Sequence, residues 1–291
     1  MFRILIIFLF MSPLAGFSAT FPIKIVAGVL VSEAVIEGKE VSVIFDSGSP
    51  GLVLNSKYYT AKHEMDLCPC TGINGNFECQ TYKVSHWSWM EVENKQTTAI
   101  LSDLSFLESA LHKEIHALVG LSVLADYYVS IDFDLMSVTL SKKLDVDKKE
   151  VMYFDYVDQL PVITCEVNGE KKTLGLDTGS EINYIFSIAP REKKVLMTHA
   201  IPVMVIGTEN KQDLKYSTTM ELNIDGQEYN SNFIIDSDLT GNFHHADFDG
   251  FLGLEFLDQF NITIHPGKQI LMLTPRAQPG STMLASALSM Q

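Results

Sequence analysis

Short apolar and β-branched runs, separated by turn residues, dominate the chain after its first twenty residues. These runs cover residues 41–45, 129–133, 162–167, 220–224 and 233–235. Their residue types are those that fit a pleated, half-buried strand. Asn168-Gly169 and Asp225-Gly226 lie between such runs and are typical of β-hairpin turns. Helix signals are sparse, so the pattern predicts an all-β fold.

The chain also contains an internal duplication. Residues 37–49 align with residues 168–180 at an offset of 131, which places Asp46 on Asp177. A second block, 120–127, aligns with 253–260 at an offset of 133. Two separated blocks with nearly the same displacement are hard to obtain by chance, so the chain is expected to fold as two similar halves. One short turn or helix is expected after the Gly-Leu pair of each second block.

The duplication sets the expected domain organisation. We predict an N-terminal lobe over residues 20–147 and a C-terminal lobe over residues 148–275. The charged, pattern-free segment 144–150 marks the join. A flexible tail is expected over residues 276–291, where Pro and Gly follow the last apolar run.

Residues 1–19 have the layout of a secretory signal peptide. Arg3 precedes the apolar run 4–11, and a small-residue stretch follows. The run is shorter than the roughly 20 residues of a membrane span. An uncleaved anchor is the alternative. We therefore expect an exported protein, periplasmic or secreted, with no stable membrane span after signal removal.

Composition narrows the possible partners. The chain of 291 residues has 36 acidic and 21 basic residues, which gives a net charge of −15. Such a charge repels polyphosphates, so no nucleic-acid partner is expected. Apolar residues make up 46% of the chain, enough for a sizeable core.

In each half, an apolar strand runs into an Asp-Ser/Thr-Gly-Ser tetrapeptide. The two copies are Asp46-Ser47-Gly48-Ser49 and Asp177-Thr178-Gly179-Ser180. One copy is weak evidence, because these residues are ordinary turn formers. Two copies at equivalent places would meet at a pseudo-twofold axis, and carboxylates ~3 Å apart share one proton. One could then activate a water while the other protonates a carbonyl oxygen, so Asp46 and Asp177 are the predicted catalytic pair.

The neighbouring residues have predicted supporting roles. Gly48 and Gly179 would let the two backbones approach closely. The hydroxyls of Ser47 and Thr178 are expected to brace the two loops across the axis. Those of Ser49 and Ser180 are expected to donate to the outer carboxylate oxygens, which would favour ionisation and an acidic working pH.

These motifs resemble those of the aspartic proteases of the pepsin and retropepsin superfamily, over roughly residues 25–275. The resemblance implies that hydrophobic-hydrophobic-Gly elements ending at Gly120 and Gly253 support the catalytic loops. It also implies a bilobal acid-protease fold, in which two β-barrel-like lobes flank a cleft. The implied activity is an aspartic endopeptidase acting on extended polypeptides, monomeric and with neither metal nor organic cofactor.

Members of the superfamily cover the cleft with one or two hairpin flaps. The equivalent positions in this chain are Gly72, Ile73, Asn74 and Gly75 in the first half and Gly207 and Thr208 in the second. The chain is shorter than a pepsin, so shorter loops and a more open cleft are expected. A catalytically inactive relative that binds peptide or acts as an inhibitor is the alternative function. A third possibility is that the two halves dimerise with other chains.

Two further motifs leave alternatives open. Cys79 could form a disulfide with Cys68 or Cys70, and free thiols or a metal site are the other interpretations. His244-His245, just before the second Gly element, favours a polar surface turn over a metal site.

Overall fold

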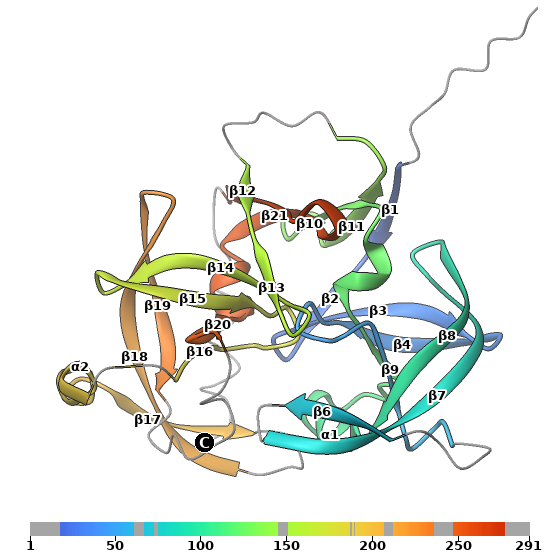
Figure 1. The fold of residues 1–291 in the computed structure, drawn as a ribbon, viewed down its shortest axis with the longest axis horizontal. Helices are drawn as coiled ribbons and strands as arrows, with labels where there is room; N and C mark the ends of the chain where they lie inside the picture. Colours follow the sequence, from blue (N-terminus) through green and yellow to red (C-terminus); the bar gives the residue numbers. More distant parts are fainter. Residues whose placement is uncertain are drawn as a thin grey trace, which may run out of the picture.

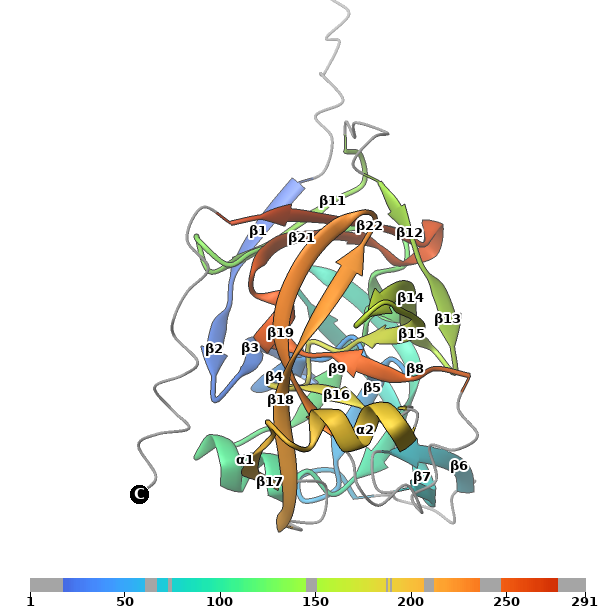
Figure 2. The same ribbon diagram turned by 90° about the vertical axis from the view of Figure 1, so that its left-hand side faces the viewer.

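The computed structural model describes residues 18–60, 67–72, 75–144, 151–186, 188, 190–206, 212–235 and 247–276 (Figure 1). Across these residues the chain is almost entirely β, and its strands form three sheets. Two eight-stranded sheets form one lobe each, and a six-stranded sheet joins the lobes along one side (Figures 1 and 2). The predicted all-β, bilobal fold is confirmed.

The sheet of the first lobe draws all its strands from the first half of the chain. In hydrogen-bonding order they are β2 (Lys24–Val26), β3 (Val29–Ile36), β4 (Lys39–Phe45), β9 (Ala117–Val119), β5 (Leu52–Asn55), β8 (Val92–Ser102), β7 (Gly75–Trp89) and β6 (Leu67–Gly72). An additional pairing of β3 with β7 curls the sheet back on itself.

The sheet of the second lobe repeats this order. Its strands are β13 (Asp155–Val157), β14 (Leu160–Val167), β15 (Glu170–Leu176), β20 (Gly250–Leu252), β16 (Asn183–Ile185), β19 (Gln227–Ile235), β18 (Gln212–Ile224) and β17 (Ile201–Ile206). Here β14 also pairs with β18, the counterpart of the β3–β7 pairing. The same connectivity in both lobes confirms the duplication read from the sequence.

The six-stranded sheet is shared equally by the two halves. Its order is β1 (Ser18–Pro22), β11 (Ser137–Ser141), β10 (Tyr128–Asp132), β21 (Phe260–His265), β22 (Ile270–Pro275) and β12 (Met152–Tyr153). At its centre Ser130 pairs with Thr263, its equivalent in the repeat, and their hydroxyl oxygens are 2.9 Å apart. The pseudo-twofold axis therefore passes between these two residues.

Helices occupy little of the described chain. They are α1 (Ser105–Leu111), η1 (Leu121–Leu124), α2 (Pro190–Leu196), α3 (Leu254–Leu257) and η4 (Pro266–Lys268). The short helices η1 and α3 follow Gly120 and Gly253, as expected from the sequence. The helices α1 and α2 were not predicted, because seven residues complete only two turns and leave too short a periodic pattern. Among the described residues, no helix is long and apolar enough to cross a membrane.

Two buried tryptophans position the strand that leads to Asp46. Trp87 and Trp89 lie on the same face of β7 and are almost fully buried. The ring of Trp89 packs on Phe45 at a centroid distance of 5.0 Å, and its Nε1 donates to Ser32 Oγ at 2.8 Å. Trp89 thus fixes Phe45, the residue directly before Asp46.

Candidate active site

The ends of β4 and β15 place the two aspartates. β4 runs parallel to β9, and β15 runs parallel to β20. Beyond the last strand residue, Asp46 N donates to Val119 O at 3.0 Å and Asp177 N donates to Leu252 O at 2.9 Å. Each aspartate therefore begins a loop. Its amide is hydrogen-bonded to the residue directly before Gly120 or Gly253.

Ser47 and Thr178 connect the two loops through four reciprocal hydrogen bonds. Ser47 N donates to Thr178 Oγ1 at 3.0 Å, and Thr178 N donates to Ser47 Oγ at 2.8 Å. Ser47 Oγ donates to Leu176 O at 2.7 Å, and Thr178 Oγ1 donates to Phe45 O at 2.9 Å. Because both side chains are buried, these bonds hold the two loops together out of contact with water.

Gly48 and Gly179 lie against the opposite carboxyl groups. A Cβ on Gly48 would stand 3.0 Å from Asp177 Oδ1, and one on Gly179 would stand 2.4 Å from Asp46 Cγ. The amide of each glycine also donates to the carboxylate of its own loop, Gly48 N to Asp46 Oδ1 and Gly179 N to Asp177 Oδ1, both at 2.9 Å. The structure thus brings Asp46 and Asp177 together: a Cβ at Gly179 would clash with Asp46, and one at Gly48 would be a tight contact with Asp177.

Burial and proximity shift the titration of both carboxyl groups. Burial raises the pKa of Asp46 well above its ordinary value, and the charge of Asp177 and a hydrogen bond with it act in the same direction. Burial also raises the pKa of Asp177, while hydrogen bonds from Gly179 N and with Asp46 oppose the shift. Both aspartates, taken as whole residues, remain partly exposed. Such a pair can hold one proton at a pH where two isolated carboxyls would both be ionised.

The hydroxyls of Ser49 and Ser180 do not make the expected bonds to the carboxylates. Ser180 Oγ donates to Ile182 O at 2.9 Å, and within the described residues Ser49 Oγ is buried without a hydrogen-bond partner. The acceptor of Ser180 is thus a carbonyl two residues along its own chain, a local bond that is common for serine in turns. The backbone amides of these serines do stabilise the loops, since Ser49 N donates to Asp46 O and Ser180 N donates to Asp177 O.

Gly120 and Gly253 hold the far ends of the two loops. A Cβ on Gly120 would stand 2.0 Å from Ser49 O, and one on Gly253 would stand 2.2 Å from Ile182 O. The amide of Gly253 donates to Asn183 Oδ1 at 2.9 Å. Asn183 is fully buried, and its function was not predicted from the sequence. The sequence feature that could have indicated this function is the single asparagine in the otherwise apolar segment 182–186.

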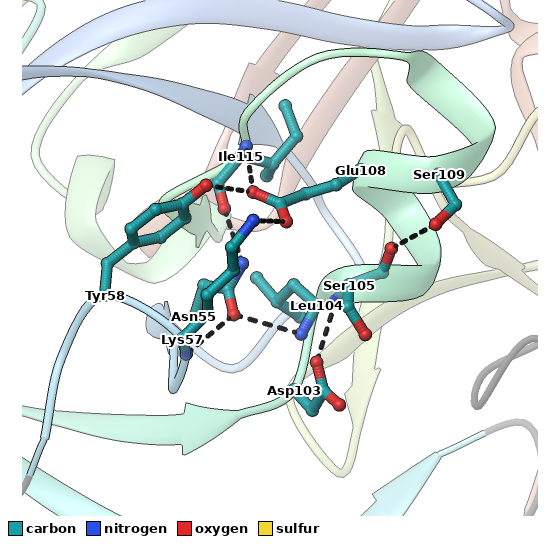
Figure 3. A network of polar contacts seen from close by, with 9 residues as sticks. All are labelled: Asn55, Lys57, Tyr58, Asp103, Leu104, Ser105, Glu108, Ser109 and Ile115. Carbon is teal, nitrogen blue, oxygen red and sulfur yellow. Dashed lines mark hydrogen bonds and ion pairs between the residues drawn. The ribbon is translucent and has the colours of Figure 1, made fainter.

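A polar network anchors the chain that follows β5 in the first lobe (Figure 3). Asn55 Nδ2 donates to Ile115 O at 2.8 Å. Glu108, on α1, accepts from Lys57 Nζ at 2.8 Å, Tyr58 OH at 2.5 Å and Ile115 N at 3.1 Å. These contacts fix α1 and the segment after β5 to each other.

The flap positions are described only in part. The strands β6 and β7 form a hairpin in which Gly72 pairs with Gly75. The strands β17 and β18 form a second hairpin, and Figure 1 shows both extending toward the middle of the molecule on the side away from the six-stranded sheet. Ile73, Asn74, Gly207 and Thr208 lie outside the described residues, as do His244 and His245. The flap assignment stays a prediction.

Comparison with known proteins gives a match at the level of structure. No protein-family model matches the chain, and no curated protein matches it. The crystal structure of aspartic proteinase from Irpex lacteus is similar, with a TM-score of 0.59 and 13% sequence identity. The match covers 91% of this chain and 99% of that chain. Over almost its whole length, the chain therefore has the bilobal all-β fold of this fungal aspartic proteinase.

Proposed function

We propose that the protein is an aspartic endopeptidase that hydrolyses extended polypeptides, with Asp46 and Asp177 as its catalytic residues. The main support is the pair of carboxyl groups, one from each lobe, that are hydrogen-bonded to each other and have raised pKa values. The bonds between Ser47 and Thr178 hold this pair in place before substrate binds. The fold shared with an aspartic proteinase agrees with this function.

The shared proton defines the proposed mechanism. The ionised carboxylate takes a proton from a water lying between the two groups, and the water oxygen attacks the substrate carbonyl carbon. The protonated carboxyl gives its proton to the carbonyl oxygen, which yields a neutral tetrahedral diol. Proton transfer to the amide nitrogen and loss of the diol proton then break the C–N bond and restore the starting state. No covalent enzyme intermediate forms.

We extend this proposal to the surroundings of the aspartate pair. Because both aspartates belong to one chain, a monomer would be sufficient for activity. We assign the β6–β7 and β17–β18 hairpins as flaps over the bound polypeptide. We also propose a Cys68–Cys79 disulfide at the base of the first hairpin, because the strand register sets Cys68 opposite Cys79. A disulfide fits the export expected from residues 1–19.

Cleavage of a denatured protein between pH 3 and pH 7 tests this function. Wild type should cut it, and Asp46→Asn and Asp177→Asn should each lose about 1,000-fold or more in rate while keeping the wild-type circular dichroism spectrum. Because burial and the neighbouring carboxyl raise the pKa values, activity should persist well above pH 3.8, the ordinary aspartate value. Equal cleavage by all three proteins would exclude these residues as catalytic. A folded wild type that cleaves nothing would favour the inactive, peptide-binding relative.

A further inference from the structure

Glu181 reaches from the catalytic loop of the second lobe to the first lobe. It is the fourth residue after Asp177. Its side chain lies against Gly28, in the turn between β2 and β3, so closely that a Cβ on Gly28 would stand 2.3 Å from Glu181 Cγ. The backbone beneath is fixed, because Glu181 O accepts from Glu255 N at 2.9 Å. Glu181 therefore lies where the catalytic loop of the second lobe meets the first lobe.

The carboxylate of Glu181 has no partner among the described residues. It is half-buried, and burial raises the pKa of Glu181 with no opposing cation or hydrogen bond. The neighbouring carboxylate of Glu255 differs, since Asn232 Nδ2 donates to its Oε1 at 2.7 Å. A partly desolvated carboxylate without a partner is unfavourable for stability. When ionised, this carboxylate is therefore available to a cation that comes from outside the chain.

Within the two catalytic loops, this charge is present on one side of the pseudo-twofold axis only. At the offset of 131 that relates the two catalytic loops, Pro50 is the counterpart of Glu181, and Gln159 is the counterpart of Gly28. Neither counterpart carries a charge. An extended chain that crosses the axis over the two aspartates would meet a carboxylate on one side and an uncharged proline on the other.

We propose that Glu181 is a specificity-determining residue that binds a lysine or arginine side chain of the substrate, on one side of the scissile bond only. This inference rests on the proposed peptidase function. A charge-assisted hydrogen bond to a half-buried carboxylate is stronger than an exposed ion pair, and it corresponds to about tenfold in binding or more. At neutral pH, the net charge of −15 would attract the same basic substrates to the protein from a distance.

A set of peptides tests the inference. Each has one cleavable bond and a single lysine at one of the four positions on either side of it, and an alanine peptide serves as the reference. Wild type should show about tenfold higher kcat/KM for lysine at one position, or two adjacent ones, on one side. The preference should lie mainly in KM and should weaken as salt rises from 0.05 to 0.5 M. Glu181→Gln should abolish the lysine-to-alanine ratio, and Glu181→Lys should favour a glutamate peptide at the same position.

Glu228→Gln is the matched control, because Glu228 is exposed near the turn between β18 and β19. It should keep the wild-type ratio. If wild type cleaves the alanine peptide but shows no lysine preference, or if Glu181→Gln retains that preference, the inference is wrong and the peptidase function stands. If no peptide is cleaved under any condition, both the function and the inference fail.

Discussion

Ser47 and Thr178 each satisfy the amide of the other while donating to the carbonyl that precedes the opposite aspartate. Thr178 Oγ1 is bonded to Ser47 N and Phe45 O, and Ser47 Oγ is bonded to Thr178 N and Leu176 O. The two aspartate loops therefore share one set of buried bonds. Loss of either hydroxyl would leave two buried backbone groups without partners.

We accordingly expect Thr178→Val, which nearly conserves shape, to lower the free energy of unfolding by about 2–4 kcal/mol. It should also reduce kcat/KM strongly, because the loops lose their alignment. Thr178→Ser keeps the hydroxyl and should restore most of both quantities. Urea denaturation and peptide cleavage measure the effects. A Thr178→Val protein as stable as Thr178→Ser would show that these bonds contribute little.

Gly179→Ala should affect activity far more than stability. Its Cβ would stand 2.4 Å from Asp46 Cγ, so the carboxyl group must move, and we expect at least a 100-fold loss in kcat/KM. Gly169→Ala is the control. Gly169 lies in a hairpin turn with a φ of +79° and open space around it, so alanine should cost about 1 kcal/mol of stability and no activity. Equal activity of the two variants would contradict the close approach.

Asp258 makes stability depend on pH. It is 6% exposed, and burial raises its pKa to about 6, although the charge of Arg276 lowers it in part. Because the folded state favours the protonated form, this contribution is fully present below about pH 3.8 and is lost as pH rises through 6. Asp258→Asn should therefore be more stable than wild type at pH 8, by at most about 3 kcal/mol, and nearly equal to it at pH 3.5. An equal difference at both values, by chemical denaturation, would rule out this titration as the cause.

In the network on α1, substituting the two partners of one ion pair should lower the free energy of unfolding by unequal amounts. The Lys57 side chain is 53% exposed and that of Glu108 is 11% exposed. Lys57→Ala should cost less than about 1 kcal/mol, as exposed ion pairs usually do. Glu108→Ala also leaves Ile115 N and Tyr58 OH without an acceptor, so it should cost about 2–3 kcal/mol. Thermal or urea denaturation of the two variants measures these losses of stability. Similar losses in both would contradict the role given to Glu108.

The duplication explains why so much of the architecture could be predicted. Once residues 37–49 were aligned with 168–180, equivalent strands, turns and aspartate loops followed in both halves, because similar sequences fold similarly. The alignment could not predict which hydrogen-bond partner each polar side chain would have. The hydroxyl of Ser180 bonds to a carbonyl in its own loop, and Asn183 acquires its function only when Gly253 lies beside it. Such choices depend on packing, and short periodic patterns carry no information about it.

The pairing of β10 with β21 also bears on the history of the chain. Ser130 and Thr263 are equivalent residues paired about the axis, so either half offers an edge strand that a second copy of itself could complete. Two identical half-length subunits could therefore have formed the same sheet and contributed one aspartate each. Fusion into one polypeptide would free the two halves to differ, as Glu181 and Pro50 do at equivalent positions.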